Sequence, residues 1–265
     1  MISRLITLGP TGTFSSEAAQ LLFPDAALDL YPNFDMVFDV LQKTNGIALV
    51  PLENSLHGSV DEVLDLILET DTHVWRTDEI AVRQSIGALD RSKVKRVASH
   101  SQALSQCREY LRREFLTAER FPTSSTVMAI DLALKDPTIA AIGSTQTMKQ
   151  RGLPVLAEDI QSKSSNTTRF AVVAKEDPFP DRSKTQMSVV LHLKKDDRPG
   201  LLHDMLTPFK IYDVNLTRIE NRPTGERLGD YLFFLDFMGN RKSPRVQKVL
   251  EEIGTFADIR FLGEW

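Results

Sequence analysis

Small polar side chains gather at one point of the sequence, where a polar loop runs into an apolar stretch. The motif consists of Asn166, Thr167, Thr168, Arg169 and Phe170. The apolar run that starts at Phe170 predicts a buried strand. An amide, two hydroxyls and a guanidinium at the mouth of a strand can hold and polarise a small substrate, because a rigid scaffold aims such loops. A turn in which these side chains only cap the backbone is the alternative, and the motif taken alone favours it.

Four other junctions between a predicted strand and a predicted helix carry the same kind of side chain. They contain Thr11, Thr13, Phe14 and Ser15; Glu53, Asn54 and Ser55; His100 and Gln102; and Ser124, Ser125 and Thr126. Free N–H groups at helix N-termini favour carboxylates, so converging junctions would hold a small anion through neutral donors. Turn chemistry for Asn54 and Ser55, and a structural role for His100, remain alternatives. Two-lobed binding proteins hold carboxylates in the same way, so this feature alone does not distinguish an enzyme.

Apolar strands and amphipathic helices alternate through the first two thirds of the chain. Strands are expected at 2–8, 28–31, 46–52, 94–98 and 139–142, and helices around 15–22, 34–41, 60–68, 103–113 and 127–134. This alternation predicts an α/β fold with parallel sheets. Ser15 is expected to cap the first helix. The turn before it lacks the third glycine of a dinucleotide site and the Gly-Lys-Ser/Thr of a P-loop, which argues against nucleotide binding.

Composition and charge exclude several classes of protein. The 265 residues are 42% hydrophobic and 26% charged, which is ordinary for a soluble globular chain of one large or two modest domains. No apolar run is long enough to span a membrane, and residues 1–8 are too short and mixed for a signal peptide. A net charge of −4 argues against nucleic-acid binding.

Cysteine and histidine usage argues against metal chemistry. The single cysteine, Cys107, fits a reducing cytosol and shares a helical face with Leu104 and Leu111, which favours a core position. The five histidines show no metal-ligand spacing. We therefore expect no metal and a cytoplasmic location.

A second domain follows a segment rich in proline and charge at 176–183. Strands are expected at 187–193, 214–220, 231–238 and 259–262, with helices at 201–209 and 246–253. The order βαββαβ predicts a small ferredoxin-like domain.

Both halves resemble the monofunctional prephenate dehydratases that carry a C-terminal ACT domain. The catalytic resemblance rests on 9–15, 50–55, 99–104 and 166–170, and the ACT resemblance on 197–202 and 215–223. The family usually has Ala where Leu201 stands and Ser where Asn221 stands, and often Asp where Ser162 stands. The resemblance implies a two-lobed catalytic domain like periplasmic binding proteins over 1–180, with parallel or mixed sheets, a cleft and a second lobe at roughly 76–165. An ACT domain would cover 187–265. The resemblance is to the monofunctional form, so no chorismate-mutase helices are expected before Met1.

The resemblance implies that prephenate loses carbon dioxide and water to give phenylpyruvate in phenylalanine biosynthesis, and that this reaction needs no cofactor. It implies catalytic roles for Thr168, Arg169, Asn54 and Ser55. Substrate binding would involve Thr11, Thr13, Phe14, Ser15, Glu53, His100, Gln102, Ser124, Ser125, Thr126, Asn166, Thr167 and Phe170. Thr168 is expected to polarise the leaving hydroxyl. Arg169 could bind a carboxylate or pair structurally with Glu53.

Regulation and assembly are also implied by the resemblance. Phenylalanine is expected to bind at Pro199, Gly200, Leu201, Leu202, Asn215, Leu216, Thr217, Glu220, Asn221, Arg222 and Pro223. An edge strand of an ACT domain is expected to pair with another chain, giving a homodimer or a tetramer built as a dimer of dimers. An arogenate dehydratase, or a non-catalytic two-lobed sensor of amino acids or dicarboxylates, remains the alternative.

Overall fold

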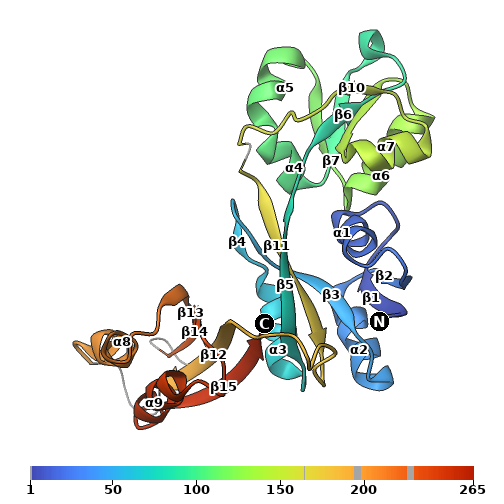
Figure 1. The fold of residues 1–265 in the computed structure, drawn as a ribbon. Helices are drawn as coiled ribbons and strands as arrows, with labels where there is room; N and C mark the ends of the chain where they lie inside the picture. Colours follow the sequence, from blue (N-terminus) through green and yellow to red (C-terminus); the bar gives the residue numbers. More distant parts are fainter. Residues whose placement is uncertain (1, 164, 194–197, 226–229) are drawn as a thin grey trace. The chain divides into compact units, whose positions relative to one another are not determined.

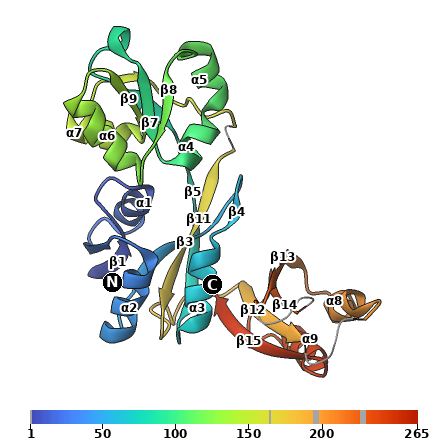
Figure 2. The ribbon, with the colours of Figure 1, turned by 180° about the vertical axis from the view of Figure 1, so that it is seen from behind.

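The computed structural model describes residues 2–163, 165–193, 198–225 and 230–265 (Figures 1 and 2). The chain divides into two compact units, one of residues 1–66 and 78–171 and one of residues 67–77 and 172–265. Three elements contribute residues to both units: α3 (Asp61–Glu69), β5 (His73–Ala81) and β11 (Thr167–Ala174).

The first unit has two lobes, and the first lobe is built on a sheet in the order β5-β11-β3-β1-β2. Its further elements are β1 (Arg4–Leu8), α1 (Phe14–Leu22), β2 (Ala27–Tyr31), α2 (Phe34–Thr44), β3 (Ala48–Asn54) and β4 (Gly58–Ser59). Strand β1 pairs in parallel with β2 and β3. Ala48, Leu49 and Val50 are fully buried, as a parallel strand covered on both faces requires.

The second lobe has a five-stranded sheet in the order β10-β6-β9-β7-β8, whose strands are labelled in Figures 1 and 2 taken together. Its elements are β6 (Ser85–Gly87), η1 (Arg91–Lys93), β7 (Arg96–Ser99), α4 (Ser101–Gln106), α5 (Arg108–Glu114), β8 (Glu119–Pro122), α6 (Thr126–Lys135), β9 (Ile139–Gly143), α7 (Thr145–Arg151) and β10 (Val155–Ala157). Val97 packs into a core with Leu104 and Leu111, whereas its neighbour Ala98 packs into a second core with Ile130 and Met148. The alternation along β7 shows that helices cover both faces of the sheet.

One helix prediction for this lobe is wrong. Residues 103–113 form parts of two helices, because the chain departs from helical geometry at Cys107, where φ is −99° and ψ is 11°. Cys107 itself is fully buried in the core, as its helical face indicates.

The two lobes of this unit contact each other through α1 and α7. The Glu17 carboxylate accepts hydrogen bonds from Ser144 Oγ and, at 2.6 Å, from Thr147 Oγ1. Thr147 Oγ1 also lies 2.9 Å from the Gly12 carbonyl oxygen. Gly12 has φ of +93°, and a Cβ atom there would stand 2.7 Å from Thr147 Cγ2. Only glycine therefore allows this close approach.

The second unit contains the predicted βαββαβ domain. Its elements are β12 (Gln186–Leu193), α8 (Leu201–Ile211), β13 (Leu216–Pro223), β14 (Tyr231–Met238), α9 (Pro244–Ile253) and β15 (Ala257–Glu264). The antiparallel order is β13-β14-β12-β15. Val189 and Leu235 of the sheet form one core with Phe209 of α8 and Val249 of α9. The ferredoxin-like prediction is confirmed.

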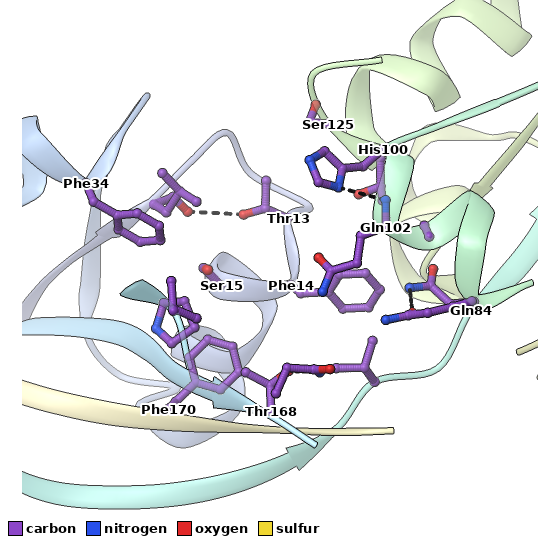
Figure 3. Close-up of a pocket in the computed structure, with 18 of the residues that line it drawn as sticks. Thr13, Phe14, Ser15, Phe34, Gln84, His100, Gln102, Ser125, Thr168 and Phe170 are labelled. Atoms are coloured by element: carbon purple, nitrogen blue, oxygen red, sulfur yellow. Dashed lines mark hydrogen bonds between the residues drawn. The ribbon is translucent and has the colours of Figure 1, made fainter. Parts of the chain in front are cut away.

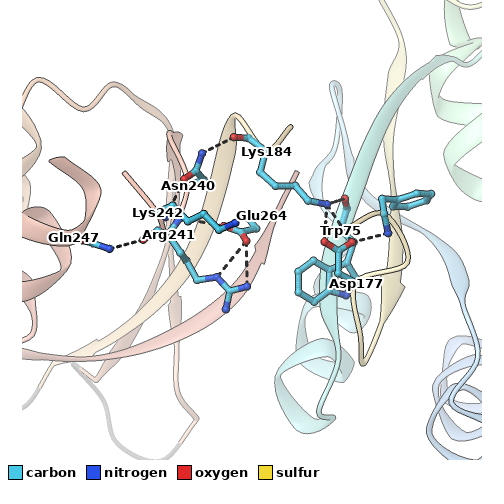
Figure 4. Close-up of polar contacts among 9 residues, drawn as sticks. Trp75, Asp177, Lys184, Asn240, Arg241, Lys242, Gln247 and Glu264 are labelled. Carbon is cyan, nitrogen blue, oxygen red and sulfur yellow. Dashed lines mark hydrogen bonds and ion pairs between the residues drawn. The ribbon is translucent and has the colours of Figure 1, made fainter. Parts of the chain in front are cut away.

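The segment that precedes β12 is packed within this unit around Lys184 (Figure 4). Lys184 Nζ lies 3.1 Å from Asp177 Oδ2 and only 9% of its side chain is exposed. The ammonium lies 5.7 Å from the ring centroid of Trp75 and 6.0 Å from that of Phe179. Asn240 Nδ2 donates to the Lys184 carbonyl at 2.8 Å. The proline-rich segment is therefore anchored by charge, ring and backbone contacts.

Within the described ranges, no helix is long and apolar enough to cross a membrane.

Candidate active site

A cavity of about 440 Å³ is enclosed by both lobes of the first unit (Figure 3). Its size falls in the range of roughly 300 to 1,000 Å³ that is usual for small-molecule sites. The first lobe and the strands leading from it contribute Leu8, Thr13, Phe14, Ser15, Phe34, Pro51, Asn54, Val60, Glu62, Val82, Gln84, Thr168 and Phe170. The second lobe contributes His100, Gln102, Ala103, Gln106, Ser124, Ser125 and Thr126. These lining residues, all in the described part of the chain, include no lysine or arginine.

The N-terminus of α1 forms one edge of the cavity. Thr13 is the N-cap, because its Oγ1 accepts from Ser16 N at 3.2 Å. Thr13 Oγ1 also donates to the Leu8 carbonyl at 3.1 Å. The expectation that Ser15 caps this helix is wrong: Ser15 lies in the first turn, buried, on the cavity wall.

Asn54 and Thr168 meet where β3 ends and β11 begins. Asn54 Nδ2 donates to Thr168 Oγ1 at 3.0 Å, and the two residues are 8% and 9% exposed. The backbone N–H of Leu56 lies 3.1 Å from Asn54 Oδ1. Because that N–H can only donate, it fixes which side of the amide is oxygen and turns Nδ2 toward Thr168.

The same anchor sets the direction of a chain of buried amides. Asn54 Nδ2 donates to Asn166 Oδ1 at 2.9 Å, so Asn166 Nδ2 donates onward to Gln106 Oε1 at 3.0 Å. Gln84 Nε2 donates to the same Gln106 oxygen at 3.2 Å. With its carbonyl occupied, Gln106 has its amide nitrogen to offer to a ligand in the cavity.

Side chains alternate along β11, and the alternation separates the residues of the motif. Thr168 and Phe170 line the cavity, whereas Thr167 and Arg169 do not. Arg169 forms an ion pair with Glu53, and their side chains are 17% and 34% exposed. Because side chains alternate along a strand, Arg169 and Thr168 point to opposite faces of β11, and Arg169 pairs with Glu53. The sequence left this structural pair open as the alternative to binding a substrate carboxylate.

Helix N-termini form the facing wall, from the second lobe. Ser125 caps α6, with its Oγ accepting from Met128 N at 3.1 Å. His100 Nδ1 accepts from Gln102 N at 3.4 Å at the start of α4. Figure 3 shows His100, Gln102 and Ser125 across the cavity from Thr13 and Ser15. Backbone N–H groups at such termini are suited to anionic groups.

Eleven of the residues that the sequence proposed for chemistry or substrate binding lie on the cavity wall, and six do not. The six are Thr11, Glu53, Ser55, Asn166, Thr167 and Arg169. Thr11 is exposed. Ser55 ties the loop before β11, since its Oγ donates to Ser165 O at 2.8 Å and accepts from Thr167 N at 3.0 Å. Asn166 lies behind the wall, 1% exposed.

Sequence reasoning missed nine lining residues: Leu8, Phe34, Pro51, Val60, Glu62, Val82, Gln84, Ala103 and Gln106. The sequence could have indicated one of them. Gln106 stands four residues after Gln102 in one helical segment, so the two amides share a face. Gln84 lies outside every strand and helix expected from the sequence, and no pattern pointed to it.

Ionisable groups near the site show no metal or thiol chemistry among the described residues. No group of three or more His, Cys, Asp or Glu side chains in those ranges could hold a metal ion. Burial raises the pKa of the Cys107 thiol to about 12. That thiol stays protonated at neutral pH and has no nucleophilic role.

The residues expected to bind phenylalanine lie around the start of α8 and along β13. Gly200 is the N-cap of α8 with φ of +84°, Leu201 is buried and Leu202 is 46% exposed. Strand β13 comes first in the order of the described sheet and alternates half-buried and exposed residues. Asn215 directly precedes it and is exposed. Asp197 of the ACT-like motif lies outside the described residues.

A two-lobed α/β unit with a cavity bordered by helix N-termini, followed by a ferredoxin-like domain, defines a class of proteins in which a small-molecule site is joined to a second small domain. The prephenate dehydratase family model matches residues 5–178, and the ACT domain model matches residues 195–255. The chain belongs to the prephenate dehydratase family and carries an ACT domain.

Similar proteins cover nearly the whole chain. A prephenate dehydratase of Methanocaldococcus jannaschii is 34% identical over 97% of this chain and 95% of its own length. One from Lactococcus lactis subsp. lactis is 34% identical over 99% and 97%. A solved structure of prephenate dehydratase from Arthrobacter aurescens, in complex with L-Phe, is 33% identical with a TM-score of 0.88 and covers 98% of this chain and 89% of that one. The predicted family, fold class and lyase activity are confirmed.

Proposed function

We propose that the cavity converts prephenate to phenylpyruvate with Thr168 as the residue that polarises the leaving hydroxyl. The bond from the ring to its carboxylate breaks and carbon dioxide leaves. The electron pair moves through the ring and expels the hydroxyl, which takes up a proton from solvent and leaves as water. The ring becomes aromatic, which drives the reaction, so the protein has only to position the groups and stabilise developing charge.

The observation that carries this role is the bond from Asn54 to Thr168. Thr168 Oγ1 accepts that bond at 3.0 Å, and within the described residues its own O–H has no acceptor. The hydroxyl proton is therefore available to a ligand in the cavity. A free threonine hydroxyl is a very weak acid, so Thr168 acts as a polarised donor, not as an autonomous acid.

The two substrate carboxylates are held by neutral donors. The N-termini of α1 and α6 and the Gln106 amide supply N–H groups on the cavity wall. Hydrogen bonds from neutral donors bind the carboxylate that leaves without the strong ground-state attraction of a guanidinium, which would oppose its loss. Arg169 supports the wall through Glu53.

Substitution of Thr168 tests this assignment. Thr168→Ala removes the donor and is expected to lower kcat roughly 10²- to 10³-fold with little change in KM. Thr168→Ser keeps a hydroxyl on the same backbone and is expected to retain most of the turnover. Steady-state rates of phenylpyruvate formation from prephenate measure both. Near-normal kcat in Thr168→Ala, in a protein with unchanged thermal unfolding, would remove Thr168 from the mechanism.

Regulation by L-phenylalanine through the ACT domain is part of the proposal. Support comes from the ACT match and from the L-Phe complex of the Arthrobacter protein. The edge position of β13 supports pairing of two chains into a homodimer or a dimer of dimers. Calorimetric titration of the full chain with L-phenylalanine, together with its mass in solution, tests both. Absence of heat at millimolar ligand would count against the effector.

Substrate preference is the second point to test, since arogenate differs from prephenate only by an amine in place of the side-chain ketone. Separate assays with each substrate, following phenylpyruvate and phenylalanine, distinguish the two dehydratases. Turnover of neither would favour a binding module. The lone reduced cysteine is consistent with a cytoplasmic location.

A further inference from the structure

A histidine outside the cavity contacts the amide that holds Thr168. His57 lies in the turn that follows β3, exposed to solvent, and its Nδ1 is 3.1 Å from Asn54 Oδ1. Asn54 Nδ2 is in turn 3.0 Å from Thr168 Oγ1. An imidazole, a carboxamide and a hydroxyl are therefore joined in series, with the hydroxyl at the cavity and the imidazole at the surface.

The direction of every bond in this series is determined. Asn54 Oδ1 is the oxygen, because the Leu56 backbone N–H donates to it at 3.1 Å. A carboxamide oxygen only accepts, so His57 must carry its proton on Nδ1. That proton is present in the neutral ring and in the charged ring alike. What changes on protonation of Nε2 is the strength of the donor, since charge-assisted hydrogen bonds are roughly twice as strong as neutral ones.

We propose that His57 is a positioning residue for the dehydration step: it polarises the Asn54 carboxamide and thereby strengthens Thr168 as a donor to the leaving hydroxyl. Chained hydrogen bonds reinforce one another. A donor on Oδ1 makes the Nδ2 hydrogens more positive, and a stronger bond into Thr168 Oγ1 makes its O–H a better donor. The inference rests on the role proposed for Thr168.

The surroundings of His57 determine how it can respond to pH. Its ring lines an outer cavity of about 230 Å³, in which the charged side chains are Arg108, Glu109 and Lys163. Gln106 lines both this cavity and the main one. On the inner side, the ionisable lining residues are Glu62 and His100. A charged ring is the stronger donor, so kcat is expected to rise with acidity over the pH range in which histidines change charge.

Two substitutions separate the effect of the hydrogen bond that His57 donates from the effect of the charge on its ring. In His57→Asn the side-chain amide nitrogen can take the place of Nδ1 as a neutral donor that does not titrate. In His57→Ala no side-chain donor to Asn54 Oδ1 remains, and only the Leu56 backbone N–H still donates to it. The measurements are kcat and KM for prephenate from about pH 5.5 to about pH 8.5, with an enzyme-free reaction at each pH. The ratio of wild-type kcat to variant kcat cancels any pH dependence that both proteins share.

The expected ratio for His57→Asn is close to one at the alkaline end and rises roughly 3- to 10-fold at the acidic end. For His57→Ala it is about 3- to 10-fold already at the alkaline end, and KM is unchanged in both. Glu109→Gln alters a charge in the outer cavity without a contact to Asn54. It is expected to keep the acidic rise in kcat.

Two results would overturn the inference. One is a His57→Ala profile that superimposes on that of the wild type. The other is a pH-independent ratio accompanied by lower thermal stability in both variants, which would make His57 a turn residue only. Thr168→Ala separates the role of Thr168 from that of His57. If it abolishes turnover while the His57 variants behave as wild type, Thr168 keeps its role and His57 has none.

Discussion

The two walls of the cavity are built in different ways. On the first-lobe wall, Asn54 and Thr168 are buried and bonded to each other across two strands. On the second-lobe wall, Ser125 and His100 bond to the backbone of the helices that they begin. Tertiary bonds hold the side chains of the first wall to each other, whereas the helix caps of the second wall mainly present N–H groups. The first wall is suited to the bond-breaking step and, through the N-terminus of α1, to one carboxylate, and the second wall is suited to holding carboxylates.

The largest effect is expected from breaking the first wall at Asn54. Asn54→Ala removes the donor to Thr168 and the start of the amide chain toward Gln106. We expect kcat to fall roughly 10²-fold, with KM changed far less. Steady-state kinetics with prephenate check this. A loss confined to KM would mean that Asn54 only binds substrate, and the contrast between the walls would fail.

The support beneath the first wall is tested by the Arg169–Glu53 pair. Removing either partner leaves a partly buried charge, so Arg169→Leu and Glu53→Gln are each expected to lower the free energy of unfolding by about 1 to 3 kcal/mol. The double variant should lose less than the sum, because the two side chains contact each other. Urea unfolding of the wild type, the two single variants and the double variant measures this double-mutant cycle. A raised KM in Arg169→Leu at unchanged stability would indicate that Arg169 binds a substrate carboxylate.

The second wall is tested by a matched pair of helix caps. Ser125→Ala on the cavity and Asn33→Ala at the start of α2 each remove one bond from a side chain to a helix N–H. Both are expected to cost about 1 kcal/mol of unfolding free energy. Only Ser125→Ala is expected to raise KM, by roughly 2- to 10-fold with kcat nearly unchanged. Equal KM values in the two variants would show that α6 does not contact the substrate.

The smallest effect is expected where the lobes meet, at Glu17. Burial raises the pKa of this carboxyl, against the opposing hydrogen bonds from Ser144 and Thr147. A carboxyl with a raised folded pKa binds protons more tightly when folded. It therefore adds stability below its unfolded pKa, and that stability is lost as pH rises through the folded pKa.

Comparison with Glu17→Gln isolates this contribution. The wild type is expected to gain stability relative to the variant as pH falls from 7 toward 4.5, the ordinary pKa of a glutamate side chain. Thermal unfolding at stepwise pH measures the difference. A constant difference across that range would show that the Glu17 proton is not linked to folding.

The arrangement of strands and helices could be predicted from the sequence because the apolar patterns of its strands and of its helices are both strong. Continuous apolar strands alternating with amphipathic helices indicated α/β layers, and βαββαβ order indicated the ferredoxin-like domain. The break at Cys107 was not readable, because Cys107 keeps its apolar face while the backbone leaves the helix. The cap at Thr13 was missed because several hydroxyls in one turn can each serve as an N-cap.

The site was readable where side chains lie at strand ends and unreadable where they meet through tertiary contacts. The period of two along β11 already separates Thr168 from Arg169. Gln84 and Asn166 meet at Gln106 only because two segments remote in sequence fold against α4. Proline, glycine and hydroxyl residues mark junctions locally, whereas an amide in a strand or helix looks the same whether or not it joins a network.

The cavity wall has a consequence for ionic strength. Its described lining residues offer a substrate with two carboxylates N–H and O–H groups and no ammonium or guanidinium. Added salt weakens attraction between full charges at the surface far more than short hydrogen bonds in a recess. Affinity for prephenate is thus expected to change little between dilute buffer and physiological salt. The product, with one carboxylate fewer, leaves without having to separate from a buried cation.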